Sequence, residues 1–86
     1  MSYQILFEKA SIKSLRKLPV DAQVKIIEAI EKLSEEPRPH GCKKLEGREG
    51  YRIRIGDYRV IYLINDNTVT VLILDIGKRK EIYKKK

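Results

Sequence analysis

The chain has 86 residues, of which 42% are hydrophobic and 36% charged, and its formal net charge is +7 at pH 7. This length allows one domain with one modest core, and this composition excludes a disordered chain. No apolar run approaches the roughly 20 residues that span a bilayer, and no basic N-terminal region precedes an apolar stretch, so we expect neither a membrane segment nor a secretory signal. The single cysteine, Cys42, excludes an internal disulfide and suits a reducing compartment, so we expect a cytoplasmic protein.

The positive charge is concentrated in the second part of the chain. Residues 1–37 carry six Lys or Arg and six Asp or Glu, whereas residues 38–86 carry thirteen Lys or Arg and six Asp or Glu. Such asymmetry favours a polyanionic partner, most often a nucleic acid. The alternatives are a charge that only keeps the protein soluble and the Lys- and Glu-rich composition of a thermophile.

The first part of the chain predicts a strand and two helices. "YQILF" (3–7) is a short apolar run typical of a strand. Helical spacing follows as far as Pro19, at Phe7, Ala10, Ser11, Leu15 and Leu18. Asp21 is expected to cap a second helix, which ends before Pro37 and Pro39. Its apolar positions are Ala22, Ile26, Ile27, Ala29, Ile30 and Leu33. The short connection predicts an antiparallel helical hairpin.

The second part predicts a glycine-rich charged loop followed by strands. The loop covers residues 38–50, and the strand-like runs are Tyr51–Ile55, Tyr58–Ile64 and Thr68–Asp75. Gly56-Asp57 and Asp66-Asn67 are the expected hairpin turns. The order β-α-α-β-β-β predicts an α+β fold: an N-terminal strand and a helical hairpin packed on a mainly antiparallel sheet, with a short basic C-terminal segment. We expect residues 1–86 to form a single domain.

The two-residue turn at Gly56-Asp57 fixes which residues of the first hairpin face each other. Arg54 should lie opposite Arg59, and Arg52 opposite Ile61. Side-chain alternation puts an apolar set on the other face, under the helices: Tyr51, Ile53, Ile55, Tyr58, Val60, Tyr62 and Ile64. Like charges directly opposite each other destabilise a sheet, so the three arginines indicate a function. The alternative is a scatter of solvated surface arginines.

The same counting, applied to the turn at Asp66-Asn67, extends to the last strand. It pairs Ile64 with Val69 and Tyr58 with Asp75, so that Lys78 and Arg79 should arrive beside Arg54 and Arg59. The rest of the arginine face is apolar, which generally marks a partner site unless the C-terminal segment covers it through Ile82. We expect a partner to bind Ile61, Leu63, Leu72 and Leu74, which share this face with Thr70.

Three stretches resemble the RelE/ParE superfamily of toxins from toxin–antitoxin pairs: "KLEG" (44–47), "YRIRIGDYRVIYLI" (51–64) and "VLILDIGKRKEIY" (71–83). With the preceding β-α-α order, the resemblance covers nearly the whole chain. It implies a RelE-like domain and, for the RelE branch, a ribosome-dependent endoribonuclease that cuts mRNA in the decoding site. In that reaction a ribose 2′-hydroxyl attacks the neighbouring phosphate and leaves a cyclic phosphate and a free 5′-hydroxyl.

The resemblance also implies roles for individual residues. Arg54, Arg59, Arg79 and Tyr83 fall on catalytic positions, and Arg52, Lys78 and Lys80 are expected to bind RNA. Guanidinium groups would stabilise the charge that develops on the phosphate, and Tyr83 could stack on a base. The RelE prototype has lysine at both positions of the first hairpin strand, one of them the general base. Arginine keeps its proton at neutral pH and cannot act as a general base, so the identity of the general base is left open.

The implied partners are a RelB-like antitoxin in a hetero-oligomer, the ribosome and mRNA. No cofactor is expected, and His40 and Cys42 alone do not make a zinc site, so the nuclease is predicted to be metal-independent. Two other functions stay open: a ParE-like inhibitor of DNA gyrase without chemistry of its own, and a basic nucleic-acid-binding module.

Overall fold

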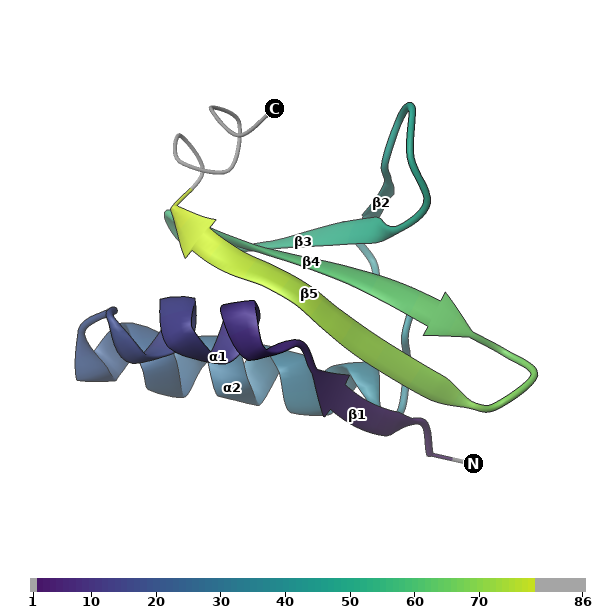
Figure 1. Cartoon of the computed structure of the whole chain (residues 1–86), viewed down its shortest axis with the longest axis horizontal. Coiled ribbons are helices and arrows are strands. Elements are labelled where there is room, and N and C mark those ends of the chain that lie inside the picture. Colours follow the sequence, from purple (N-terminus) through teal and green to yellow (C-terminus); the bar gives the residue numbers. More distant parts are fainter. Residues whose placement is uncertain (1, 79–86) are drawn as a thin grey trace.

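The computed structural model describes residues 2–78 and has the predicted α+β architecture. The two helices lie together on one side of a five-stranded sheet, and the chain reverses direction between them (Figure 1). The elements in chain order are β1 (Gln4–Phe7), α1 (Lys9–Arg16), α2 (Val20–Leu33), β2 (Lys43–Lys44), β3 (Tyr51–Ile55), β4 (Tyr58–Asn65) and β5 (Thr70–Lys78). Neither helix of this part of the chain is long and apolar enough to cross a membrane.

The sheet has the strand order β1-β5-β4-β3-β2. Strand β1 runs parallel to β5, and every other pair is antiparallel. The short strand β2 lies within residues 38–50, which the sequence predicts to be a loop throughout. As a result β4 and β5 are central, and β1 and β2 form the two edges.

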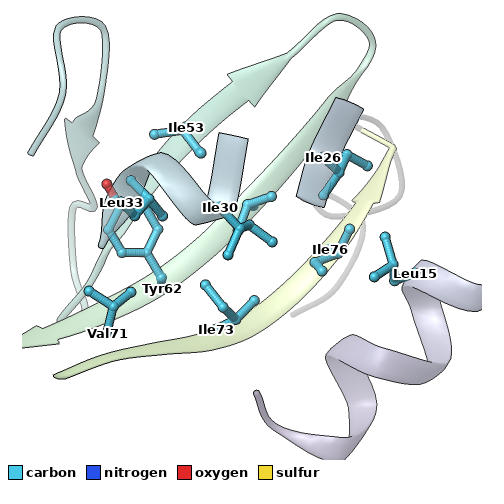
Figure 2. Packing of buried hydrophobic residues seen from close by; sticks show 10 residues of the cluster. Leu15, Ile26, Ile30, Leu33, Ile53, Tyr62, Val71, Ile73 and Ile76 are labelled. Atoms are coloured by element: carbon cyan, nitrogen blue, oxygen red, sulfur yellow. The ribbon is translucent and has the colours of Figure 1, made fainter. Parts of the chain in front are cut away.

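One core fills the space between the helices and the sheet, as Figure 2 shows. The predicted apolar spacing is confirmed on α2, where Ile26, Ile30 and Leu33 are buried against Tyr62 and Ile73. Ala10 on α1, which was expected in the same layer, is exposed. Helix α2 also begins two residues earlier than predicted, with Pro19 at its N-cap position, so Asp21 lies in the first turn and is not the cap.

The register of the first hairpin is confirmed in full. Ile55 lies opposite Tyr58, Arg54 opposite Arg59, and Arg52 opposite Ile61. Gly56 has a φ of 60°, a value that glycine adopts without strain in a tight turn. The sheet face predicted to be apolar packs against the helices, so the arginines are on the far side.

The register of the second hairpin differs from the prediction. Asn65 pairs with Thr70 and Ile64 with Val71, so the turn has four residues, 66–69, in place of two. The Asn65 side chain holds this turn, because its Oδ1 accepts hydrogen bonds from the amides of Asn67 and Thr68. A bulge then shifts the pairing again between Ile61 and Tyr62. The sequence shows neither the four-residue turn nor the bulge, so counting residues outward from Asp66-Asn67 could not give the correct pairing of β4 with β5.

Strand β2 is joined to β3 by a tight loop that requires glycine. The Leu45 amide donates a hydrogen bond to the Gly50 carbonyl across the base of this loop, at 2.9 Å. Gly50 has a φ of 130°, and a Cβ there would lie 3.2 Å from the Tyr62 carbonyl oxygen. The loop is therefore held close against β4.

Candidate functional site

The sheet face away from the helices carries arginines that are mostly buried. Arg59 on β4 is 1% exposed and Arg52 on β3 is 7% exposed, whereas their neighbour Arg54 is exposed. The predicted juxtaposition of the three is confirmed. The alternative, a scatter of solvated surface arginines, does not fit the burial of Arg52 and Arg59. On the neighbouring strand β5, Arg59 pairs with Gly77, which has no side chain to occupy the space beside the guanidinium.

Arg52 and Arg59 line a pocket of about 440 Å³. It is lined by Lys43, Lys44, Leu45, Glu46, Arg48, Arg52, Arg59 and Ile61. Five of these side chains are cationic and one is acidic, so the pocket has the charge and the donors to hold a polyanion such as a phosphodiester.

Three of the cations in the pocket lie in a segment that the sequence predicts to be a loop. Lys43 and Lys44 form strand β2, and Arg48 lies in the loop that follows. A signal for them does exist in the sequence, because Gly47 and Gly50 both have positive φ and close a hairpin between residues 43–44 and 51–52. The charge of this segment made it resemble a loop.

The predicted position of Lys78 is wrong. The corrected register pairs Tyr58 with Lys78, where Asp75 was expected, and pairs Arg59 with Gly77. Because side chains alternate, Lys78 projects to the same side of the sheet as Tyr58, away from Arg59. Arg79, Lys80, Ile82 and Tyr83 lie outside the described residues, and the roles implied for them stay predictions.

The apolar part of the arginine face is less open than the sequence suggested. Ile61 is only 5% exposed and forms a wall of the cationic pocket. Leu63 and Leu72 lie opposite each other and are half-buried, as is Leu74. Leu74 falls in the β5 stretch where the pairing with β4 is shifted.

A separate cluster at the far end of the hairpin joins the segment after α2 to the sheet. The Arg38 guanidinium forms an ion pair with Asp66 at 2.9 Å and lies 5.3 Å from the centre of the Tyr51 ring. Hydrogen bonds from Arg38 and from the Tyr3 hydroxyl lower the pKa of Asp66, and the Asp66 carboxylate raises the pKa of Tyr3 in return. Tyr62 donates to the Pro37 carbonyl at 2.8 Å, and burial raises the pKa of that phenol. These contacts are structural.

Within residues 2–78, no three His, Cys, Asp or Glu side chains gather in a way that could hold a metal ion. The cations that line the pocket can bind a phosphate and stabilise negative charge on it.

The fold and the pocket together define a class: a small α+β domain that packs its core on one sheet face and carries a cationic pocket on the other. The family of ParE toxins of type II toxin–antitoxin systems (parDE) matches residues 5–83. The chain is 34% identical to toxin RelG of Mycobacterium tuberculosis over 99% of this chain and 100% of RelG. It is 28% identical to the mRNA interferase toxin RelE of Escherichia coli over 96% of this chain and 92% of that protein.

The solved structures agree with the sequences. The archaeal RelE–RelB complex from Pyrococcus horikoshii contains a chain that superimposes with a TM-score of 0.82 at 35% identity, over 92% of this chain and 97% of that one. The protein belongs to the RelE/ParE superfamily of toxins of type II toxin–antitoxin systems, within its RelE branch. The resemblance seen in the sequence is thereby confirmed.

Proposed function

We propose that this toxin is a ribosome-dependent endoribonuclease that cleaves mRNA in the decoding site and so arrests translation in the cytoplasm. The observation that carries the proposal is the pair of arginines at the pocket, Arg52 and Arg59, which lie on the sheet face away from the helices. The name of the Escherichia coli relative, an mRNA interferase, supports the same activity.

The reaction we propose is transfer of a phosphodiester to its own ribose. The 2′-hydroxyl attacks the adjacent phosphorus, the bond to the 5′-oxygen breaks, and the products are a cyclic phosphate and a 5′-hydroxyl. Negative charge grows on the phosphate oxygens in the transition state, and Arg54 and Arg59 stabilise it there more than in the ground state. Because the substrate supplies its own nucleophile and the arginines supply the charge, the reaction needs no metal. Arg79 and Tyr83 remain proposed participants.

We propose a RelB-like antitoxin as the inhibitor, bound in a hetero-oligomer. The RelE of Pyrococcus horikoshii was solved as a complex with RelB, which supports this partner. The half-buried leucines at positions 63, 72 and 74, with Ile61 behind them, offer an apolar strip next to the cationic pocket. An antitoxin segment with apolar residues flanked by acids would fit both at once.

A second candidate follows from the matching family, which is named for ParE. In that case the protein would inhibit DNA gyrase and leave messages intact. The nuclease and the gyrase inhibitor differ in what they require of the arginines. Only the nuclease needs the Arg59 guanidinium to bind a phosphate through two hydrogen bonds.

The test is the Arg59→Lys variant on ribosomes programmed with a message. Lysine keeps the charge and most of the buried stem but loses the bidentate guanidinium. We expect cleavage to slow about a hundredfold, as for loss of one preorganised donor. Arg16→Lys on α1, an exposed arginine on the helix side, is the matched control and should cleave like the wild type. Intact messages with wild-type protein, together with inhibited gyrase, would replace this proposal by the ParE-like function.

A further inference from the structure

The two-residue strand β2 brings a lysine into line with the arginines of the sheet. Lys43 pairs with Arg52, and directly opposed residues of an antiparallel pair share one face. Its neighbour Lys44 pairs with Tyr51 and so alternates toward the other face. Lys43 and the loop residue Arg48 are exposed and line the pocket that has Arg59 as another wall.

The cations of this face fall into two parallel rows. One row runs across β3 and β4 and consists of Arg54 and Arg59. The other runs across β2 and β3 and consists of Lys43 and Arg52. Arg52 and Arg54 are two residues apart on one strand, so the rows are separated by about 6.6 Å. That spacing is comparable to the distance between successive phosphates of an extended RNA strand.

Each row has one buried and one exposed cation, namely Arg59 and Arg54 in the first and Arg52 and Lys43 in the second. Arg59 is almost fully buried, as a group that must meet a transition state should be. Lys43 and Arg48, which line the same pocket, are exposed. An exposed, strongly hydrated lysine acts as a point charge on a phosphate and imposes little geometry on it. Such groups bind substrate and transition state equally well.

We propose that Lys43 and Arg48 bind the phosphate next to the reacting one, and that strand β2 is a binding arm for single-stranded RNA. This inference rests on the proposed function, since it takes RNA as the ligand. The arm is positioned before RNA arrives, because the Leu45–Gly50 hydrogen bond and the close approach of Gly50 to β4 hold the loop. Glu46, the one acid among the lining residues, should oppose the binding of a phosphate there.

The role of the arm predicts a separation of kinetic effects. Removing Lys43 should raise KM several-fold and leave kcat close to that of the wild type, because the lost interaction is uniform. Arg59→Lys should instead lower kcat and leave KM close to that of the wild type. Glu46→Gln should tighten binding, because it removes a repulsion between a carboxylate and the phosphates.

The test is binding of the free toxin to a short RNA oligonucleotide with 2′-deoxyribose at the cleavage position, which removes the nucleophile and prevents cleavage. Fluorescence anisotropy over a series of salt concentrations gives Kd and the slope of log K against log salt. Lys43→Ala and Arg48→Ala should each weaken binding several-fold and make that slope shallower by about 0.7, the value for one phosphate contact on a single strand. Lys32→Ala on α2 removes the same charge on the helix side and should change neither.

The outcomes separate this inference from the proposed function. If the wild type cleaves no message but Lys43→Ala still makes the slope shallower, the nuclease proposal fails and the arm stands. Equal slopes for the Lys43→Ala and Lys32→Ala proteins, or no binding of the oligonucleotide by the wild type, would overturn the arm even if cleavage occurs. The Lys43→Ala protein could also bind RNA normally and bind an acidic antitoxin peptide weakly. That result would assign β2 to the protein partner and would overturn its proposed role in RNA binding.

Discussion

Strand β4 has two buried faces of opposite chemical character. Toward the helices it presents Val60 and Tyr62, which are fully buried among apolar side chains. Toward the other side it presents Arg59 and Ile61, which are nearly as buried, at 1% and 5% exposure. Burial therefore does not distinguish core from site in this protein.

The difference between the faces lies in what their burial costs. An apolar side chain gains free energy when it leaves water, whereas a guanidinium loses hydration that even a good partner rarely returns in full. Stability alone favours uncharged polar side chains on a sheet face that points away from the core, and it disfavours like charges opposite each other. We propose that the arginines lie there to bind an anion.

The comparison is tested most severely by deleting one side chain from each face. Ile30→Ala on α2 should lower the free energy of unfolding by about 2–5 kcal/mol, because it leaves a cavity in a closed core. That is a large part of the total stability of a domain this size, about 5–15 kcal/mol. Arg54→Ala on the other face should change it by less than about 0.5 kcal/mol, because Arg54 is exposed.

Urea denaturation of both variants, with the wild type beside them, measures these free energies. The assignment of the core to the helix side would fail if Arg54→Ala were the more destabilising of the two. A changed slope with denaturant would point to an altered unfolded state and would require a second core variant such as Ile73→Val.

The features that the sequence predicted are those with a short-range cause. Pro19 had to interrupt the helices, and the two-residue turn after Ile55 left only one register for the first hairpin. Alternation then assigned every residue of Tyr51–Ile55 to a face, including the arginines. Family motifs extended this to the whole fold.

The features that escaped prediction depend on contacts distant in the chain. Strand β2 has two residues, and only its pairing with Arg52 and Tyr51 makes it a strand. The turn at 66–69 includes Val69 with a φ of 54°, an unfavourable value for a β-branched residue that nothing in the local sequence announces. The Val69 carbonyl accepts a hydrogen bond from the amide of Gln4 in β1, so this backbone geometry is fixed by a strand more than sixty residues away.

A substitution on the arginine face alone tests the proposed chemistry of that face and leaves the apolar core on the other face unchanged. Arg54→Lys places an amine opposite Arg59, whose charge lowers the pKa of the lysine. A deprotonated lysine could serve as the general base, which arginine cannot. We expect cleavage to be as fast as in the wild type or faster, and to rise with pH up to the pKa of the lysine.

The measurement is the single-turnover rate of cleavage on the ribosome over a range of pH. Arg54→Gln, which removes the charge without supplying a base, is the control and should be slower at every pH. A lysine variant that is slower than the wild type and has the same pH dependence would show that Arg54 acts only as a cation, so that the base lies elsewhere.

The smallest effect is expected from an ion pair that belongs to neither face. Arg38 and Asp66 join the segment after α2 to the turn at the end of β4, and their side chains are 43% and 57% exposed. Exposed pairs of this kind add little to stability, in contrast to the buried arginines. Their charge can nevertheless be detected, because the pKa of Asp66 is lowered by its hydrogen bonds with Arg38 and Tyr3.

The sign of the effect follows from that direction. A carboxyl with a lowered pKa in the folded state stabilises the fold at pH above its unfolded value of about 3.9, and the contribution disappears as the pH falls through the folded pKa. Asp66→Asn should therefore lower the melting temperature slightly near neutral pH. The gap to the wild type should close below about pH 4, as the wild-type carboxyl takes up its proton. Thermal denaturation across this pH range measures the gap, and Arg38→Met in the same background should add almost nothing, because the pair is already broken. A gap that persisted in acid would mean that Asp66 acts through packing or turn geometry, and the ion pair would then contribute no measurable stability.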